Sequence, residues 1–325
     1  MERTTKKRPP SRTVVQIMFT SFDEFQSSSG IRGKHNLFDD LIPFPHQGRV
    51  FIGFPTHQTT GSSMQIALHV IPTVERESID FVDRTLNAWN QEILTMSGLL
   101  SRIIYEDELD QISKLYKEMS HDAESQNWLI NRSAHAMTAF TFKLSTPSPL
   151  ISRLHSHYFY RFDSKLAKFP LNIMSTQGIL PHPNVRIPDP TITFIQTIPM
   201  IPETIMKNCS AMIEFLETRG SLKRIGIQDV FADLDARIIK QDEVVTILTW
   251  WLNYRKNGGG SNEDLNNFLS ILKIQLDTGS VLPLAYFQYF LNPKIISPDL
   301  PLNDNVLPLR ISSKFSQKDL EYYFR

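Results

Sequence analysis

Residues 79–105 read IDFVDRTLNAWNQEILTMSGLLSRIIY and carry the clearest periodicity in the chain. Apolar side chains recur there at intervals that alternate between three and four residues, at Ile79, Val82, Leu86, Trp89, Ile93, Met96, Leu100 and Ile103. This spacing puts them on one face of an α-helix and predicts one long amphipathic helix. Ser78 is its predicted N-cap, and a helix that reaches about Tyr105 would be roughly 40 Å long at about 1.5 Å per residue.

The same stripe is compatible with a coiled-coil seam. Trp89 suits the core of a helical dimer poorly, and the stripe lacks ordered flanking charge pairs, so packing against the protein's own sheet is favoured. The acidic run at 106–108 is expected to end this helix. A second helix is predicted after it from the pattern Leu109, Ile112, Tyr116 and Met119.

Strand-forming segments precede the long helix. Residues 14–19, 49–54 and 64–71 are rich in branched and aromatic side chains, which favour strands. The last two segments are expected to pair as an antiparallel hairpin. Between them, residues 55–61 begin with proline and end with glycine, which indicates an exposed polar loop.

Prolines divide the second half of the chain. Helices are predicted at 126–144 and 150–162, and the proline-rich segment 181–202 is expected to be an extended connection between two domains. Beyond it, helical patterns precede a predicted hairpin of 271–276 and 281–284. The helical patterns lie at 203–219, 228–236, 243–256 and 263–270.

These segments define an α+β fold class. The expected fold is a small antiparallel sheet with long packed helices, followed by a mainly helical, winged-helix-like second domain. The expected parts are a poorly ordered basic N-terminus with one strand, an α+β domain, a proline-rich connection, a helical domain, and an extended segment truncated inside a helical pattern. The N-terminus covers residues 1–47 and the α+β domain covers residues 48–180. The proline-rich connection is 181–202, the helical domain is 203–291, and the last segment is 292–325.

Charge and cysteine content narrow the functional classes. The chain has 325 residues, with 34 Lys and Arg against 34 Asp and Glu, so no net charge directs it toward nucleic acid or anionic lipid. Its one cysteine, Cys209, lies on an apolar helix face, where a buried and inert thiol is expected. The lack of a secretory signal and of a long apolar segment predicts a cytoplasmic protein that makes no membrane contact. The nucleus is the alternative, because residues 6–10 read KKRPP.

The sequence contains no motif for catalysis or cofactor binding. A P-loop needs a Gly-rich turn with Lys and Ser or Thr, and an α/β-hydrolase needs Ser in a Gly-x-Ser-x-Gly turn; neither is present. His155 and His157 are the closest histidine pair, but at i and i+2 on a helix they point to different faces. We therefore expect no catalytic residue, no metal and no cofactor. For an enzyme with an unrecognised site, the cluster to nominate is His57, Thr59 and Arg76.

Two polar segments form the candidate interaction site. Polar side chains are dense in 55–61 and in 71–80, directly before the long helix. The residues nominated for partner contact are His57, Gln58, Thr59, Thr60, Gly61, Glu75 and Arg76. The alternative is that Glu75, Arg76 and Glu77 only cap and solvate the start of the helix.

The same two segments resemble a family of very large fungal proteins that are similar to sacsin and to plant Nov-type proteins. The resemblance is carried by segments 53–61, 71–80, 185–188, 250–251 and 291–296. It implies that this chain corresponds to the region after an Hsp90-like, histidine-kinase-type ATPase module. The nucleotide-binding residues of that module have no counterpart here, so ATP binding is not carried over to any position. By analogy, Arg76 or His57 would assist an ATPase module in another chain.

These observations predict a non-catalytic fragment with a chaperone-like role in protein interaction or coupling, and its partner would be a protein or an ATPase module in another chain. The alternative is a nucleic-acid-binding module that uses the winged-helix-like region 201–284. That region carries nine Lys and Arg against eleven Asp and Glu, so the positive charge that phosphates require is missing.

Overall fold

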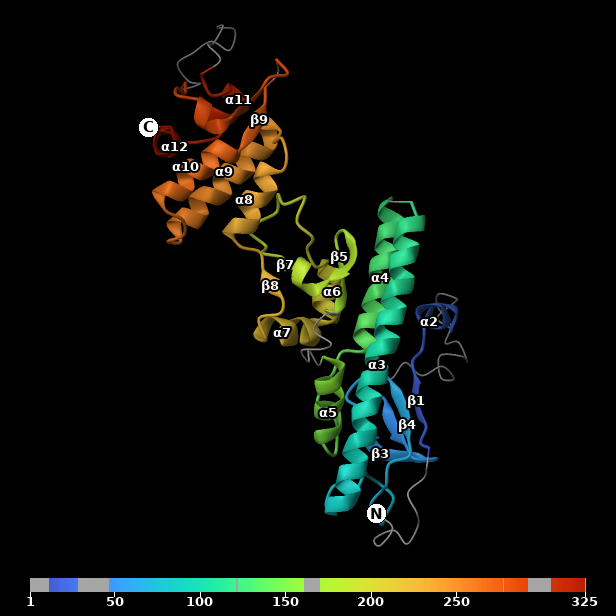
Figure 1. Ribbon diagram of the computed structural model, residues 1–325. Helices are drawn as coiled ribbons and strands as arrows, with labels where there is room; N and C mark the ends of the chain where they lie inside the picture. The colour runs from blue at the N-terminus through green and yellow to red at the C-terminus, as the bar shows by residue number, and fades with distance from the viewer. Residues whose placement is uncertain are drawn as a thin grey trace. The chain divides into compact units, whose positions relative to one another are not determined.

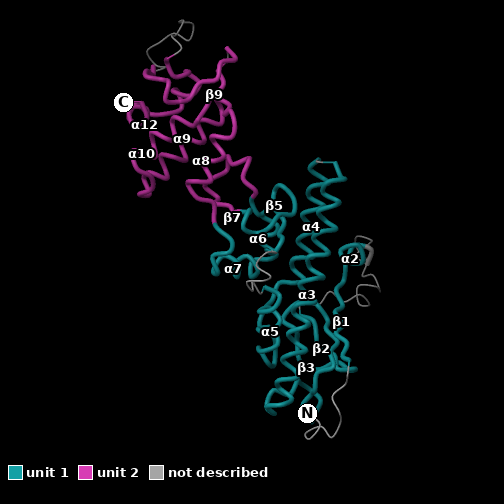
Figure 2. Tube along the Cα trace, viewed as in Figure 1, with its two compact units in different colours: residues 1–185, 200–223 teal, residues 186–199, 224–325 magenta. Residues whose placement is uncertain are grey.

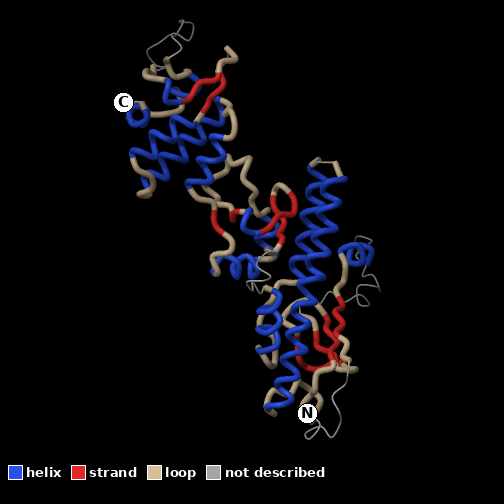
Figure 3. The backbone as a smooth tube through the Cα atoms, in the orientation of Figure 1, coloured by secondary structure: helices blue, strands red, loops and turns tan. Residues whose placement is uncertain are grey.

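The computed structural model describes residues 12–28, 47–120, 122–160, 170–276, 278–291 and 305–324. The chain divides into two compact units, each built from two stretches of sequence (Figure 2). Unit 1 comprises residues 1–185 and 200–223, and unit 2 comprises residues 186–199 and 224–325. Helices and short strands occur in both units, which confirms the α+β fold class (Figure 3). Among the described residues, no helix is both long and apolar enough to cross a bilayer.

A four-stranded sheet begins unit 1, with the strand order β1-β4-β2-β3. The strands are β1 (Val15–Met18), β2 (Arg49–Phe51), β3 (Pro55–Thr59) and β4 (Gln65–Leu68). β1 pairs with β4 and β2 with β3 in antiparallel fashion, whereas β2 and β4 are parallel. The predicted hairpin between 49–54 and 64–71 is therefore wrong, because β3 lies between these two strands in the sequence and forms the hairpin with β2.

The predicted exposed loop at 55–61 is strand β3 and the turn after it. Its inward side chains, Thr56, Gln58 and Thr60, are polar but buried. Each is hydrogen-bonded; for example, the Thr56 hydroxyl donates to the Val50 carbonyl at 2.7 Å. The strand lacks the usual alternation of apolar and polar residues because its buried side chains are polar. Hydrogen bonds satisfy these buried polar groups.

One continuous helix, α3 (Arg84–Glu118), takes the place of the two predicted helices. Its N-cap is Asp83, whose carboxylate accepts hydrogen bonds from the backbone N–H groups of Thr85 and Leu86, so the prediction of Ser78 is wrong. Val82 precedes the helix and is 94% exposed. The acidic run at 106–108 does not break the helix, because Glu106 pairs with Arg102 one turn earlier at 2.8 Å.

Helix α3 lies between the sheet and α5 (Leu150–Phe159), as Figure 1 shows. On the sheet side, Ile93 and Leu94 join an apolar cluster with Val50 and Ile66. On the α5 side, the buried positions are small, and a Cβ atom on Gly98 would lie 2.7 Å from the His155 carbonyl oxygen. The two helices can approach this closely because Gly98 has no side chain.

Unit 1 is completed by further helices and a hairpin. These elements are α2 (Phe22–Ser28), α4 (Ala123–Ala139), β5 (Asn172–Ser175), β6 (Gly178–Pro181), the 3₁₀ turn His182–Asn184, α6 (Glu203–Asn208) and α7 (Ser210–Thr218). Cys209 lies between α6 and α7 and is fully buried, as predicted, with its sulfur 3.5 Å from the Thr138 hydroxyl. Helices α6 and α7, expected at the start of the C-terminal domain, belong to unit 1.

Unit 2 contains a helical group followed by a hairpin. Its elements are β7 (Arg186–Ile187), α8 (Ile227–Asp235), α9 (Gln241–Lys256), α10 (Asn262–Ile271), β9 (Lys273–Gln275), β10 (Val281–Pro283), the 3₁₀ turn Leu284–Tyr286, α11 (Leu309–Ser312) and α12 (Gln317–Tyr323). The strand β8 (Lys223–Arg224) spans the boundary between the units. β9 and β10 pair in antiparallel fashion, which confirms the predicted hairpin. Trp251 is fully buried and stacks on Phe268 with ring centroids 4.4 Å apart.

A buried carboxylate anchors the first stretch of unit 2 to α8. Asp233 accepts hydrogen bonds from the backbone N–H groups of Gln196 and Thr197 at 2.9 and 2.6 Å, and it pairs with Arg237 at 2.9 Å. Burial raises the pKa of Asp233, but hydrogen bonds from these partners outweigh burial and bring the pKa below its ordinary value. The carboxylate therefore stays ionised in the interior of unit 2.

The expectations for the two ends of the chain are covered only in part. Residues 1–11, 29–46 and 292–304 lie outside the described residues, and so does most of the N-terminal part that we expected to be poorly ordered. The predicted N-terminal strand is β1. Near the C-terminus, the hydroxyl of Ser316 caps α12 by accepting from the Asp319 N–H.

Candidate functional site

The sequence-predicted site residues on β3 alternate between solvent and interior. The side chain of His57 is exposed and lies 3.8 Å from the Glu77 carboxylate. Gln58, Thr60 and Gly61 are buried, which removes them from direct contact with a partner. Strand β3 thus serves mainly to hold neighbouring segments.

Glu75 and Arg76 lie on the turn that precedes α3. The Thr73 N–H donates to the Ser78 carbonyl and the Arg76 N–H donates back to Thr73, both at 2.9 Å. Arg76 adopts a left-handed backbone conformation with φ of 62°, and its side chain is exposed. The nominated residues therefore divide into an exposed group and a buried group. The exposed group is His57 with Glu75 and Arg76, because the His57 N–H donates to the Glu77 carbonyl at 2.8 Å and joins the turn to β3. The buried group is Gln58, Thr60 and Gly61.

The buried half of the nominated residues holds residues 143–149, which we call the strap, between α4 and α5. Gln58 makes two hydrogen bonds to the backbone of Ser148, and the Thr59 N–H donates to the Thr146 carbonyl at 2.7 Å. The Lys143 N–H donates to the Gly61 carbonyl at 2.7 Å. These bonds fix the path of the strap along the sheet edge.

Two serines join the strap to α5. The Ser145 N–H donates to the Ser152 hydroxyl at 2.9 Å, and the Ser152 N–H donates to the Ser145 hydroxyl at 3.0 Å. Both side chains are almost fully buried. This reciprocal pair sets the position of Lys143 on the strap relative to the first turn of α5.

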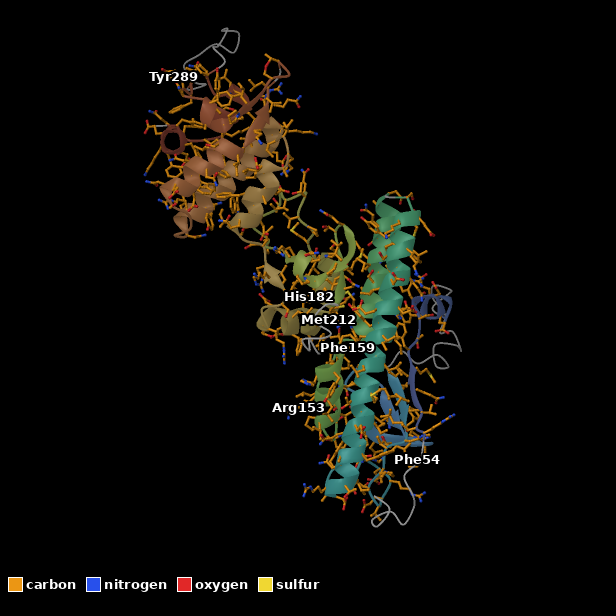
Figure 4. The ribbon with its side chains drawn as sticks, in the orientation of Figure 1. Phe54, Arg153, Phe159, His182, Met212 and Tyr289 are labelled. Carbon is orange, nitrogen blue, oxygen red and sulfur yellow. The ribbon has the colours of Figure 1, made fainter. Side chains whose placement is uncertain are left out.

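The strap, α5 and α7 line an open recess of about 320 Å³ in unit 1, which we call the aromatic–basic cavity. It is lined by Phe142, Lys143, Leu144, Ser152, Arg153, Ser156, Tyr160, Ala211 and Phe215. Tyr160 and Phe215 stack with ring centroids 4.2 Å apart, and the Arg219 guanidinium lies 4.6 Å from the Phe215 ring. Figure 4 labels Arg153 on the side of α5 that faces away from α3.

The charged residues that line this cavity are both positive. Lys143 and Arg153 are exposed, and no Asp or Glu is among the lining residues that the structure describes. In the part of the chain that the structure describes, no carboxylate pairs with either cation. The cavity therefore combines an apolar aromatic wall with two positive charges and two serine hydroxyls.

A serine and histidine pair lies beside the cavity but is enclosed. Nε2 of His155 is 2.9 Å from the Ser101 hydroxyl, and both side chains are fully buried. Ser101 donates its own proton to the Ser97 carbonyl at 2.9 Å, so its hydroxyl acts toward His155 as an acceptor. Burial lowers the pKa of His155 to about 4 and keeps the ring neutral. This pair packs α3 against α5 and is not a poised nucleophile and base.

Metal and thiol chemistry find little support in the described part of the chain. There, no three residues among His, Cys, Asp and Glu come together in a way that could hold a metal ion. Burial raises the pKa of Cys209 to about 11, which keeps the sulfur protonated at neutral pH. His155 and His157, the closest histidine pair in the sequence, are split between a buried and an exposed position.

Sequence reasoning missed the residues of the aromatic–basic cavity. Lys143 lies on the strap, Arg153 and Tyr160 lie on α5 and its C-cap, and Phe215 lies on α7; together they belong to no motif. Their one local signal is Phe142 and Lys143 at the end of the predicted helix 126–144, where an aromatic ring and a cation stand together. That signal does not reveal that α5 and α7 converge on it.

The fold and the cavity define an α+β protein of two compact units that carries a basic, aromatic-lined recess. The chain belongs to the family described as "Protein of unknown function (DUF3684)", whose model matches residues 1–324. A search of curated proteins and a search of solved structures found no match.

Proposed function

We propose that this chain is a non-catalytic protein-interaction module and that the aromatic–basic cavity is its contact site. The observation that carries the proposal is the convergence of two cations and a stacked aromatic pair on one recess. Aromatic and arginine side chains dominate the energetics of protein recognition, especially in pockets that exclude water. A recess of about 320 Å³ is large enough for one or two side chains of a partner.

The rigidity of the walls supports this proposal. The strap is held by the hydrogen bonds of Gln58 and Gly61 and by the Ser145 and Ser152 pair. Since these bonds are all made within unit 1, they hold the walls of the cavity in place, and binding costs less conformational entropy. In this proposal the nominated β3 residues support the contact site, while the strap, α5 and α7 make the contact itself.

The resemblance to sacsin-like and Nov-type proteins extends the proposal. In that setting the partner would be a client protein or an Hsp90-type ATPase module in another chain, in the cytoplasm or nucleus, and the role would be chaperone-like coupling. His57 and Arg76 are exposed and would be accessible to such a module. This part of the proposal rests on the resemblance alone.

The experiment is a selection of displayed random nine-residue peptides on the purified chain, followed by affinity measurement of enriched peptides. Ala211→Trp should fill the cavity and abolish enrichment, whereas Ala123→Trp, at an exposed position of unit 1, should leave it unchanged. Equal enrichment by both variants would remove the cavity from the proposal. Saturable ATP binding with turnover by the purified chain would contradict a non-catalytic role.

A second candidate function is nucleic-acid binding by a winged-helix-like unit 2. The order of α8, α9 and α10 followed by the β9–β10 hairpin favours it. The excess of acidic over basic residues in 201–284 opposes it. Titration of labelled duplex DNA and single-stranded RNA at low salt tests this candidate. A complex whose affinity falls with added salt would support nucleic-acid binding.

A further inference from the structure

We infer that the aromatic–basic cavity selects a peptide segment in which a carboxylate side chain stands next to an aromatic or branched aliphatic side chain. This inference rests on the proposed function, since it names the chemistry of the partner at the same site. It follows from the charge, the apolar lining and the ring geometry of the cavity.

Charge selects the carboxylate. Lys143 on the strap and Arg153 on α5 line the same recess, and among the described residues no carboxylate lines it with them. Two cations brought together without a counter-charge repel each other, and an incoming carboxylate relieves that repulsion. Arg153 can also bind a carboxylate through two parallel hydrogen bonds, which a neutral side chain cannot match.

The apolar lining selects the neighbouring side chain. Phe142, Ala211 and Phe215 are only partly buried, and Leu144 is 65% exposed. A bound apolar side chain would remove part of this surface from water, at about 25 cal/mol for each Å² buried. Leu144 directly follows Lys143, so the apolar contact and the charge contact lie on adjacent residues of the strap.

Ring geometry favours a peptide over a nucleotide. Binding of a nucleobase needs an aromatic face that is accessible for stacking. Tyr160 is 4% exposed and already stacks on Phe215, and Arg219 lies over the Phe215 ring. The rings of Tyr160 and Phe215 are therefore accessible to a ligand only at their edges. An aliphatic or aromatic side chain of a peptide can pack against such an edge.

A hollow in unit 2 provides a contrast. It measures about 610 Å³ and is lined by polar and aromatic residues, none of them charged: Asn266, Leu269, Ser270, Ala285, Phe287, Gln288, Tyr289, Tyr323 and Phe324. Figure 4 labels Tyr289 in this unit. Selection for a carboxylate is thus expected of the aromatic–basic cavity and not of hollows in general on this chain.

The test uses the displayed library of random nine-residue peptides on the full chain, with sequencing of the enriched peptides. We expect enrichment of Asp or Glu next to Phe, Leu, Ile or Val. The double variant Lys143→Glu, Arg153→Glu should weaken binding of the best enriched peptide by about tenfold or more. The control variant Lys117→Glu, Lys207→Glu makes the same charge change at exposed positions of unit 1 outside the cavity and should bind like the wild type.

The outcomes separate the inference from the function on which it rests. Enriched peptides that lack acidic residues, with affinity unchanged in the Lys143→Glu, Arg153→Glu variant, would overturn the inference and leave the interaction module standing. An absence of any enriched peptide would overturn both. Equal melting temperatures of the two double variants show that a loss of binding is not a loss of folding.

Discussion

Gln58 and Ser148 are joined by two hydrogen bonds between one side chain and one backbone: Nε2 of Gln58 donates to the Ser148 carbonyl at 3.0 Å, and Oε1 accepts from the Ser148 N–H at 3.1 Å. Gln58 is fully buried on β3. A single side chain therefore satisfies both polar groups of a residue in the strap, in a place where water has little access.

Replacing Gln58 tests how much this pairing stabilises unit 1. Gln58→Ala leaves the Ser148 N–H and carbonyl without these partners, so we expect the free energy of unfolding to fall by about 2 to 3 kcal/mol. His57→Ala, at the exposed neighbouring position, should change it by about 0.5 kcal/mol or less. Urea denaturation followed by circular dichroism measures both values, and equal effects would show that the pairing does not stabilise the fold.

A comparison of two glycines isolates the close approach of the strap to β3. Gly61 has φ of +82°, and a Cβ atom there would lie 2.3 Å from the Lys143 carbonyl oxygen and 2.6 Å from the Ser152 Cβ. Gly53 has φ of +74° but no atom within 4 Å of its Cβ position. Gly53→Ala should cost about 1 kcal/mol from backbone strain, and Gly61→Ala should cost at least about 2 kcal/mol more.

Thermal unfolding of the two glycine variants provides the measurement. Gly61→Ala should also weaken peptide binding at the aromatic–basic cavity, because Lys143 and Ser152 both line it. Similar melting temperatures for the two variants would mean that the strap can move away from β3 at little cost.

The neutral, buried His155 predicts a specific loss of stability in mild acid. Its folded pKa, about 4, lies below the unfolded value of about 6.5. The unfolded chain therefore binds more protons between these values, and the stabilisation present above pH 6.5 is lost as the pH falls toward 4, by about 3 kcal/mol. Burial also lowers the pKa of His135 and His182, which act in the same direction.

His155→Gln separates this contribution from that of the other histidines. Glutamine does not titrate and can still hydrogen-bond Ser101, so the variant should show a smaller decline of unfolding free energy between pH 6.5 and 4 than the wild type. Denaturant titrations at pH 7, 6, 5 and 4 give the two slopes. Parallel curves would show that His155 takes up its proton without cost to the fold.

The buried Asp233 carries the corresponding prediction for unit 2. Asp233→Asn removes the charge that Arg237 faces and replaces one carboxylate oxygen with an NH₂ group, which cannot accept from Arg237 or from the N–H groups of Gln196 and Thr197. Unit 2 should therefore lose about 2 to 4 kcal/mol. Asp235→Asn, which affects a mostly exposed pair with Lys273, should cost about 0.5 kcal/mol or less. Hydrogen exchange of the amides in α8 and α9 reports on unit 2, and unchanged protection in Asp233→Asn would contradict the prediction.

The sequence predicted which segments form helices and strands better than it predicted where they begin and end or which strands pair. The periodicity from Leu86 onward correctly indicated α3, although Met96 and Ile103 of the predicted stripe are exposed. The buried face also includes small residues such as Ser97 and Gly98, which an apolar pattern does not pick out. The predicted start of the helix was wrong. Ile79 is buried, but it lies before the helix, where it forms an isolated β-bridge with Pro72. An apolar residue before a helix can extend the stripe without being helical.

The strand β3 shows why the site was only half predicted. Its buried face consists of Thr56, Gln58 and Thr60, which look like loop residues. Hydrogen bonds offset their burial: Thr56 donates to the Val50 carbonyl on the neighbouring strand, and Gln58 donates to the carbonyl of Ser148 on the strap. Such partners are set by the tertiary fold and leave no local pattern. The segment was correctly picked out as unusual, but the structure places its buried residues in a supporting position.

No uninterrupted piece of this chain consists of unit 1 alone, because residues 186–199 of unit 2 lie between its two stretches. Its second stretch, residues 200–223, carries α6, Cys209 and α7, which includes the cavity residue Phe215. A polypeptide ending at residue 185 would expose the site on α4 that Cys209 occupies next to Thr138, and its aromatic–basic cavity would lack a wall. A truncated chain should therefore be tested together with residues 200–223 added as a separate peptide. Without that peptide, a loss of partner binding would not be distinguishable from a failure of unit 1 to fold.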